Sequence, residues 1–293
     1  MTLVALGRVL VLMLSCFAVA VQAEPRRYFV DVQLPQNQQE DYYIRLLHLI
    51  LNASKAPNEV IEFRFANNPL SQARWVAAVV QDKSNNVLWT MTNREREQSM
   101  RAIRVPLLKG LIGYRLLVIR KSDAAKFAKI NTKEELLALS AGQGMHWPDT
   151  EILRANKFQV TEAMAKENLY KMLVAKRFDF FPRGATEVKL EADLISSQNL
   201  MVEPHLILHY PAALYFFVKK ENTELAQRLE KGWAIILKNG EFDKLFLSTE
   251  RVQSALDFLK DPNRKIIEFE NPFLPSDTPL NISKYWVKPS SLP

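Results

Sequence analysis

The sequence predicts an α/β fold. Between residues 27 and 92, short runs rich in β-branched and aromatic residues alternate with longer runs in which apolar residues recur at helical spacing. Helices of this length are able to cross over a sheet, so the strand–helix–strand order favours parallel strands. The chain has 293 residues, which is enough for one large core or for two lobes.

The amino-terminal part of the chain gives the clearest elements. Pro69 and Ser71 suit the start of a helix, and Asn52 stands near the end of the helix before it. The expected strands are residues 27–34, 59–65 and 87–92, and the expected helices are residues 41–53 and 69–81.

The pattern continues through the middle of the chain, where residues 111–120 have the apolar character of a central strand. The other expected strands are residues 178–181 and 214–218, and the other expected helices are residues 133–138, 150–156, 166–175, 224–237 and 242–247. From residue 261 the sequence is rich in Pro and lacks periodicity. We therefore expect an extended tail that packs over the surface.

The first 23 residues have the pattern of a secretory signal. Arg8 precedes an apolar run that ends in Val21-Gln22-Ala23, a small-residue end. We expect cleavage after Ala23 and a periplasmic location. A lipoprotein signal that ends before Cys16, the single cysteine, is the alternative. Cleavage after Ala23 would leave no disulfide, no thiol nucleophile and no thiolate metal site.

The charge of the chain is mildly basic. Its formal net charge of +7 comes from 39 basic and 32 acidic residues that are interspersed along the sequence. Such a balance concerns solubility and steering, and it lacks the clustered basic stripe of a nucleic-acid binder. After the signal, no stretch has the length needed to cross a bilayer. We therefore expect a soluble mature protein with no nucleic-acid partner.

A candidate ligand site follows the third expected strand. Thr90, Thr92, Arg94 and Arg96 stand at its carboxyl end, where open α/β sheets place their ligand sites. Hydroxyl groups together with a guanidinium fork suit a carboxylate or another oxyanion. The alternative is that both arginines are surface residues of a helix start, paired with the acidic residues beside them.

A second candidate site lies between Gly142 and Thr150. Gly144 would let the backbone approach a ligand closely, while Asp149 or Thr150 could cap the helix that follows. Free N–H groups at a helix start attract anions, so we expect His146 and Trp147 to line the site. The alternative is an ordinary turn in which Asp149 is only a helix cap. No second metal ligand stands four residues from His146, so no metal site is expected.

Three segments resemble one protein family. Residues 222–246 are similar to the carboxyl-terminal signature of type II periplasmic solute-binding proteins of the amino-acid-binding class, with matches at Gly240, Asp243 and Phe246. Residues 88–121 resemble the first-lobe site of that family, where a T-x-T-x-x-R pattern ends a strand. Residues 172–181 resemble its approach to the second-lobe site. The order and spacing of the three segments carry the resemblance.

The resemblance implies two α/β lobes, each a mixed sheet flanked by helices, joined by two crossing strands that act as a hinge. It implies a small-molecule ligand in the cleft, no cofactor, a monomer, and a membrane transporter or a sensor protein as partner. The implied divisions are a signal at 1–23, lobe one at 24–118 and 215–265, lobe two at 119–214, and an extended tail at 266–293.

Two positions depart from the family pattern. The carboxylate-binding arginine of the family would fall on Glu95, which Arg94 and Arg96 flank, and the spacing to Pro106 favours Arg96. The aspartate that holds the ammonium group of the ligand is replaced by Arg183 or Gly184. A guanidinium there favours a ligand with two acidic ends or one without an amine. The alternative is that Arg183 is a solvated residue at a strand end.

The sequence therefore favours a periplasmic solute-binding protein, and not an enzyme, that captures a small polar or anionic solute for transport or sensing. One alternative is a periplasmic lyase similar to cyclohexadienyl dehydratase, with a catalytic acid among Glu95, Glu151 and Glu187. The other is a signalling partner that binds no ligand and whose cleft is filled by side chains such as Phe180, Phe181 and Tyr210.

Overall fold

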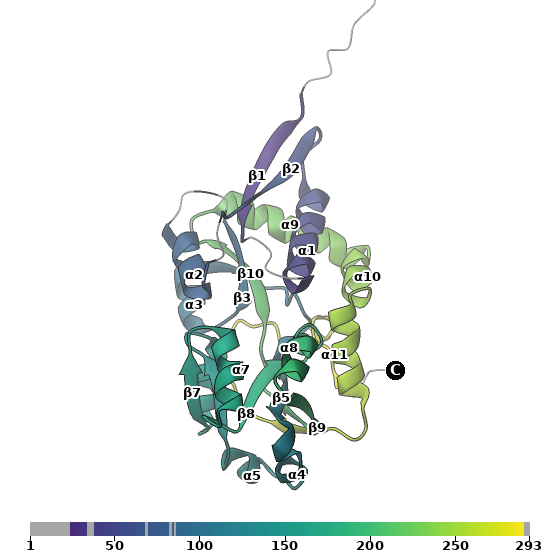
Figure 1. Ribbon diagram of the computed structural model, residues 1–293. Helices are drawn as coiled ribbons and strands as arrows, with labels where there is room; N and C mark the ends of the chain where they lie inside the picture. Colours follow the sequence, from purple (N-terminus) through teal and green to yellow (C-terminus); the bar gives the residue numbers. More distant parts are fainter. Residues whose placement is uncertain (1–23, 34–37, 68–69, 82–83, 85, 290–293) are drawn as a thin grey trace, which may run out of the picture.

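The computed structural model describes residues 24–33, 38–67, 70–81, 84 and 86–289, and these form two lobes (Figure 1). The expected signal at 1–23 lies outside the described residues. Within the described part of the chain, no helix is both long enough and apolar enough to cross a membrane.

Lobe one contains two small sheets and the helices that cover them. Strands β1 (Arg26–Val32) and β2 (Glu59–Phe65) pair in parallel, as expected. Strand β10 (Leu214–Lys219) lies between β3 (Val87–Met91) and β4 (Met100–Ile103), antiparallel to both. The helices of this lobe are α1 (Gln38–Ser54), α2 (Gln72–Gln81), α3 (Arg94–Ser99), α9 (Thr223–Lys238) and α10 (Glu241–Leu247).

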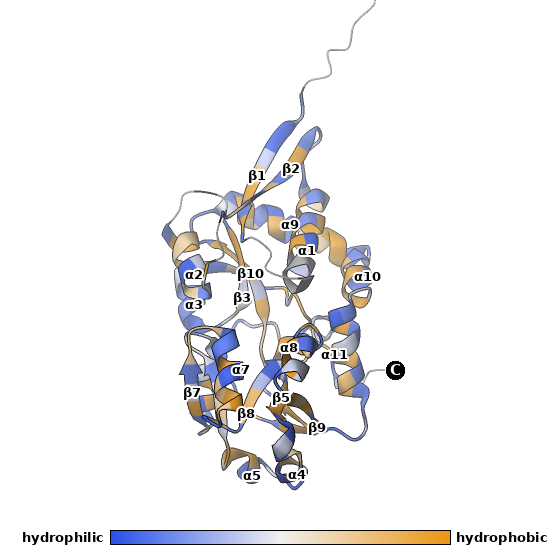
Figure 2. Ribbon diagram, in the orientation of Figure 1, coloured by the Kyte–Doolittle hydropathy of each residue, from blue (hydrophilic) through white to orange (hydrophobic). Residues whose placement is uncertain are grey.

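Lobe two contains one mixed sheet of six strands in the order β11-β9-β5-β8-β6-β7. The strands are β5 (Tyr114–Arg120), β6 (Ser140–Gly144), β7 (Gln159–Ala163), β8 (Phe180–Gly184), β9 (Leu200–His209) and β11 (Lys265–Glu268). Hydrophobic residues gather on β5 and β9 (Figure 2). The helices are α4 (Ala124–Phe127), α5 (Lys133–Leu137), α6 (Pro148–Ala155), α7 (Lys166–Val174) and α8 (Ala192–Ser197).

Several elements differ from the sequence expectation. Residues 111–113, expected to begin a strand, form a short 3-10 helix, and β5 begins only at Tyr114. Strand β6 has two glycines and no β-branched residue, so it lacks the residue types that mark a strand. Strand β9 contains Pro204, which interrupts the pattern of a strand in the sequence. The expected boundary after residue 118 falls inside β5, which pairs within the lobe-two sheet. The residue limits of the lobes stay a prediction.

The carboxyl-terminal part of the chain is a strap between the lobes, which we define as residues 250–287. Helix α11 (Glu250–Lys260) follows α10, and β11 then pairs in parallel with β9 of lobe two. The chain next returns to lobe one, where Trp286 covers Gly110 and the Val287 amide donates to the Lys109 carbonyl at 2.8 Å. The chain thus passes between the lobes twice in the strap, in addition to its passages at the β4–β5 and β9–β10 connections.

Arg251 joins the two lobes at the start of this strap. Its guanidinium donates to the Tyr43 hydroxyl of lobe one at 3.2 Å and to the Thr186 hydroxyl of lobe two at 3.3 Å. The same group lies over the rings of Tyr42 and Tyr43, and Arg251 is only 2% exposed. A buried cation that bonds to both lobes resists their separation.

We expect Arg251→Ala to loosen the contact between the lobes and to lower the free energy of unfolding by about 3 kcal/mol, because the variant loses charge-assisted hydrogen bonds and packing against two rings. Spin labels on cysteines introduced at Lys129 and Lys231, in a Cys16→Ser background, should report a broader distribution of interlobe distances. Lys260→Ala, on an exposed position of the same helix, is the matched control. An unchanged distance distribution in the Arg251 variant would contradict the bridging role.

Candidate functional site

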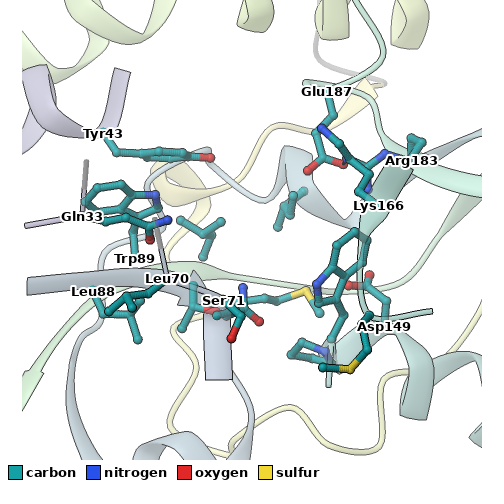
Figure 3. A pocket seen from close by; sticks show the side chains of 18 of the residues that line it. Gln33, Tyr43, Leu70, Ser71, Leu88, Trp89, Asp149, Lys166, Arg183 and Glu187 are labelled. Atoms are coloured by element: carbon teal, nitrogen blue, oxygen red, sulfur yellow. Dashed lines mark ion pairs between the residues drawn. The ribbon is translucent and has the colours of Figure 1, made fainter. Parts of the chain in front are cut away.

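A cavity of about 450 Å³, which we call the main cavity, lies between the lobes. Its two walls differ in chemistry (Figure 3). Lobe one contributes the aromatic or apolar side chains of Tyr43, Leu70, Leu88 and Trp89 and also uncharged polar ones, whereas all the charged side chains come from lobe two. The polar residues of lobe one are Gln33, Ser71, Gln72 and Thr90. The charged residues are Arg115, Asp149, Lys166, Glu167, Arg183 and Glu187. The cavity therefore suits a ligand with a polar part and an apolar part.

A second hollow of about 390 Å³, the side cavity, adjoins the main one. Trp147 and Pro148 line both cavities and so form part of the wall between them. Arg96 and His146 line only the side cavity. The ring of Trp147 lies directly against Gly144, where even a Cβ atom would come within 2.3 Å of it. The glycine therefore allows the tryptophan to occupy this position.

Arg96 is buried where the two lobes meet. Its Nη1 donates to the Thr90 hydroxyl and the Met91 carbonyl, both at 2.7 Å. Its Nη2 donates to Gln72 Oε1 at 2.7 Å and to the His146 carbonyl of lobe two at 3.4 Å. All these acceptors are uncharged, and no described carboxylate forms an ion pair with this guanidinium.

The local chain explains why Arg96 points inward. Asn93 is the N-cap of α3, and its side chain accepts from the Arg96 amide at 2.8 Å, which fixes the start of the helix. Burial lowers the pKa of Arg96 to about 10, although Asp149 and Glu95 act in the opposite sense. The group therefore remains a cation at neutral pH.

Arg94 and Thr92 lie elsewhere. Arg94 is exposed, and the Thr92 hydroxyl donates to Glu97 Oε1 at 2.6 Å. These two residues border a third, smaller hollow and line neither the main nor the side cavity. Of the two arginines that the sequence left open, Arg96 alone is buried at the junction of the lobes.

Arg183, at the end of β8, is neither solvated nor free. It is 4% exposed, and its guanidinium forms a two-pronged contact with Glu191 at 2.8 and 2.9 Å. Glu187 lies 3.2 Å from the same group, and the Trp147 ring centroid lies 5.4 Å from it. The expectation that Arg183 could be a solvated strand-end residue is therefore wrong. Its charge is also already balanced.

Arg115, on the fully buried strand β5, is a second paired guanidinium that the sequence interpretation missed. It lies 2.5 Å from Asp149 Oδ1 and 3.9 Å from Glu187. The Tyr210 hydroxyl donates to the same Asp149 oxygen. Asp149 is thus an ion-pair partner. It is not the cap of α6, because Trp147 occupies the N-cap position and no side chain caps the helix there. An arginine next to the apolar run of this strand was the available signal, since a buried charge needs a partner.

These groups form one network in lobe two, which we call the ionic network. Lys166 completes it by contacting Glu191 at 2.8 Å, and the Tyr170 hydroxyl donates to Glu191 at 2.6 Å. The network has three cations (Arg115, Lys166 and Arg183) and three carboxylates (Asp149, Glu187 and Glu191). Its charges therefore cancel.

The carboxylates of this network are held in the ionised form. Burial alone would raise the pKa of Glu191, but Arg183 and Lys166 outweigh it and lower the pKa to about 2. Burial likewise opposes ionisation of Glu187, whose pKa is nevertheless lowered, chiefly by Arg183. Both groups are consequently charged at neutral pH.

The predicted site residues fall into four groups. Thr90, Trp147, Asp149 and Arg183 line the main cavity, and Arg96, His146, Trp147 and Thr150 line the side cavity. Gly144 supports the wall between the cavities, and its carbonyl accepts from the Thr150 hydroxyl at 2.8 Å. Thr92 and Arg94 belong to neither cavity.

No protein-family model matches the sequence, and no curated protein matches it. Several solved structures do match it in fold. An arginine-specific periplasmic binding protein of Salmonella typhimurium aligns with a TM-score of 0.56 at 14% identity, over 76% of this chain and 99% of that chain. The sensor domain of a histidine kinase aligns with a TM-score of 0.54 at 13% identity, over 76% and 96% of the two chains.

The fold is that of the type II periplasmic binding proteins. An ancestral amino-acid-binding protein, described as a precursor of cyclohexadienyl dehydratase, also has this fold, with a TM-score of 0.55 at 14% identity over 75% of this chain and 94% of that chain. The predicted two-lobed fold class and the predicted resemblance are thus confirmed at the level of the fold. About a quarter of this chain lies outside these alignments.

We expect Glu191→Gln to flatten the acid sensitivity of the protein. The pKa of this group is about 2 in the folded state and near its ordinary value of 4.5 in the unfolded chain. Its contribution to the free energy of unfolding is therefore complete above pH 5 and is lost as the pH falls toward 2. The variant should lose on the order of 3 kcal/mol at neutral pH. Urea unfolding at several pH values measures this. Glu167→Gln, an exposed neighbour on α7, is the control, and parallel pH profiles for Glu191→Gln and wild type would contradict the assignment.

Proposed function

We propose that this chain is a solute-binding protein that captures a small polar solute with an acidic group between its lobes, for delivery to a transporter or a sensor. The observation that carries the proposal is Arg96, a buried cation in the wall of the side cavity whose hydrogen-bond partners are all uncharged, two of which, Thr90 and Gln72, line the main cavity of about 450 Å³. Such a cation is incomplete until an anion reaches it.

Arg96 would act as the anchor of the ligand. A ligand carboxylate would replace the contacts that its Nη2 makes with Gln72 and with the His146 carbonyl. Because charge-assisted, two-pronged pairs between guanidinium and carboxylate are stronger than bonds to neutral oxygens, the exchange is favourable. The Thr90 hydroxyl, already bonded to Nη1, would hold the guanidinium in place during this exchange.

The position of Arg96 also connects binding to the hinge. Arg96 belongs to lobe one, whereas His146, whose carbonyl it contacts, belongs to lobe two. A ligand at this junction would touch both lobes and would stabilise the arrangement in which they are close. A transporter or a sensor could read that arrangement. The signal pattern of residues 1–23 and the periplasmic-binding-protein fold together support a periplasmic location.

The charge states of the cleft favour binding over catalysis. A general acid for a dehydratase would need to keep its proton near neutral pH. The pKa of Glu187 is instead lowered, and Glu95 and Glu151 are exposed. The alternative of a signalling partner that binds no ligand is disfavoured as well. Phe180, Phe181 and Tyr210, which would fill its cleft, are buried in the core and do not line the main cavity.

We expect Arg96→Ala to weaken ligand binding at least tenfold, because removal of one partner of a buried charge pair costs about 2–5 kcal/mol. The ligand is first sought by a thermal-shift screen with amino acids, dicarboxylates, aromatic acids, sugars and peptides, since a ligand raises the unfolding midpoint by mass action. Calorimetry with the best hit then compares the variants.

Arg94→Ala is the matched control, because Arg94 stands two residues away and is exposed. Circular dichroism checks that both variants fold. Equal affinities of Arg96→Ala and wild type would remove Arg96 as the anchor. A screen in which no compound raises the midpoint would count against the proposed function itself.

A further inference from the structure

The carboxylates of the lobe-two wall already have cationic partners. Asp149 is paired with Arg115 at 2.5 Å, and Glu187 lies 3.2 Å from Arg183. Glu191 is paired with Arg183 and Lys166, each at 2.8 Å. A ligand ammonium group that entered this wall would have to compete with these buried cations.

Such a competition is unfavourable. If Asp149 turned toward a ligand ammonium, Arg115 would lose its nearest counter-ion. Water could not replace that counter-ion, because Arg115 is only 3% exposed. Leaving a buried guanidinium without a counter-ion is strongly unfavourable, and this loss offsets what the new pair would contribute. The same argument holds for Glu187 and Glu191, which share Arg183.

The remaining acidic residues around the cavities do not replace them. Glu167 lies at the main cavity but is exposed, and Glu162 at the side cavity is paired with Arg154. Glu95 and Glu151 are exposed as well. Ion pairs with solvated carboxylates contribute little to binding. Among the described residues, therefore, no buried carboxylate is available to an amine.

Arg96 supplies the other half of the argument. Because the ionic network is neutral, Arg96, whose partners Thr90 and Gln72 line the main cavity, leaves one positive charge beside that cavity without an ion-pair partner among the described residues. A single carboxylate on the ligand would balance it. A second acidic group would find no further free cation among the described residues of the main cavity, since Arg115, Arg183 and Lys166 are all engaged.

The lobe-one wall indicates the rest of the ligand. The rings of Tyr43 and Trp89 stack with centroids 5.6 Å apart and planes at 29°. Leu70 and Leu88 extend this apolar part of the wall, and Gln33 and Ser71 add polar groups beside it (Figure 3). Aromatic and branched side chains of this kind favour an apolar body.

We propose that the cleft selects a small monocarboxylate that has an aromatic or branched apolar body and no amino group. The proposal rests on the solute-binding function proposed above and names its ligand class. It differs from the amino acids named for the similar structures, because the ionic network has no carboxylate to spare for an ammonium group.

The test compares acids that differ only in the amine, on the full chain at neutral pH by calorimetry. The pairs are 3-phenylpropionate with phenylalanine and 4-methylpentanoate with leucine. The amine-free member of at least one pair should bind ten times more tightly or better. Equal or tighter binding of the amino acids would overturn the proposal while leaving the solute-binding function intact.

A result without binding in either pair also overturns the ligand class, and the broad screen then separates the two proposals. If another compound raises the unfolding midpoint, the solute-binding function stands and only the ligand class falls. If none does, both fall.

A variant tests the charge argument separately. Lys166→Met removes one cation from the ionic network, so Glu191 keeps only Arg183. The preference for the amine-free member should then decrease several-fold. Lys171→Met, at an exposed position of the same helix, should keep the wild-type preference. A Lys166 variant with the wild-type preference would overturn the charge-balance explanation.

Discussion

The ion pair between Arg183 and Glu191 is the interaction on which the binding cleft depends. Glu191 connects β8, through Arg183, with α7, through Lys166 and Tyr170. Arg183 in turn holds Glu187, which shares Arg115 with Asp149. Because each buried charge is tolerated only with its partner, the groups must be present together. The network thus shapes one wall of the cleft and at the same time determines which charges that wall can accept.

The strap imposes a second constraint, on movement. Two-lobed binders of this fold close by bending their connections, and here two further crossings accompany those connections. Arg251 bonds to Tyr43, which lines the main cavity, so the strap reaches the ligand wall directly. A cleft held near its closed form loses less freedom when a ligand binds. The strap and the ionic network therefore both favour a preorganised site.

The sequence predicted what local patterns determine. Alternating apolar residues located the lobe-one strands, and the end of β3 located Thr90 and Arg96. It missed what depends on distant contacts. The partner of Arg115 is Asp149 on α6, far along the chain, so the neutralisation of Arg115 could not be read from the residues beside it. Strand β6 contains two glycines and gains its strand form from pairing with β7, and β11 likewise depends on β9.

The contrast between Arg96 and Arg183 shows why this limit matters for function. Both arginines stand at or just beyond the end of a strand, and both have glutamates within a few residues. The glutamates near Arg96 are directed elsewhere: Glu97 accepts from Thr92 and Arg104, and Glu95 is exposed. Those after Arg183 fold back onto its guanidinium through the turn before α8. One cation is therefore without an ion-pair partner among the described residues and the other is not. Under the proposed function, that difference, set by chain direction and not by composition, determines the charge of the solute that the cleft would hold.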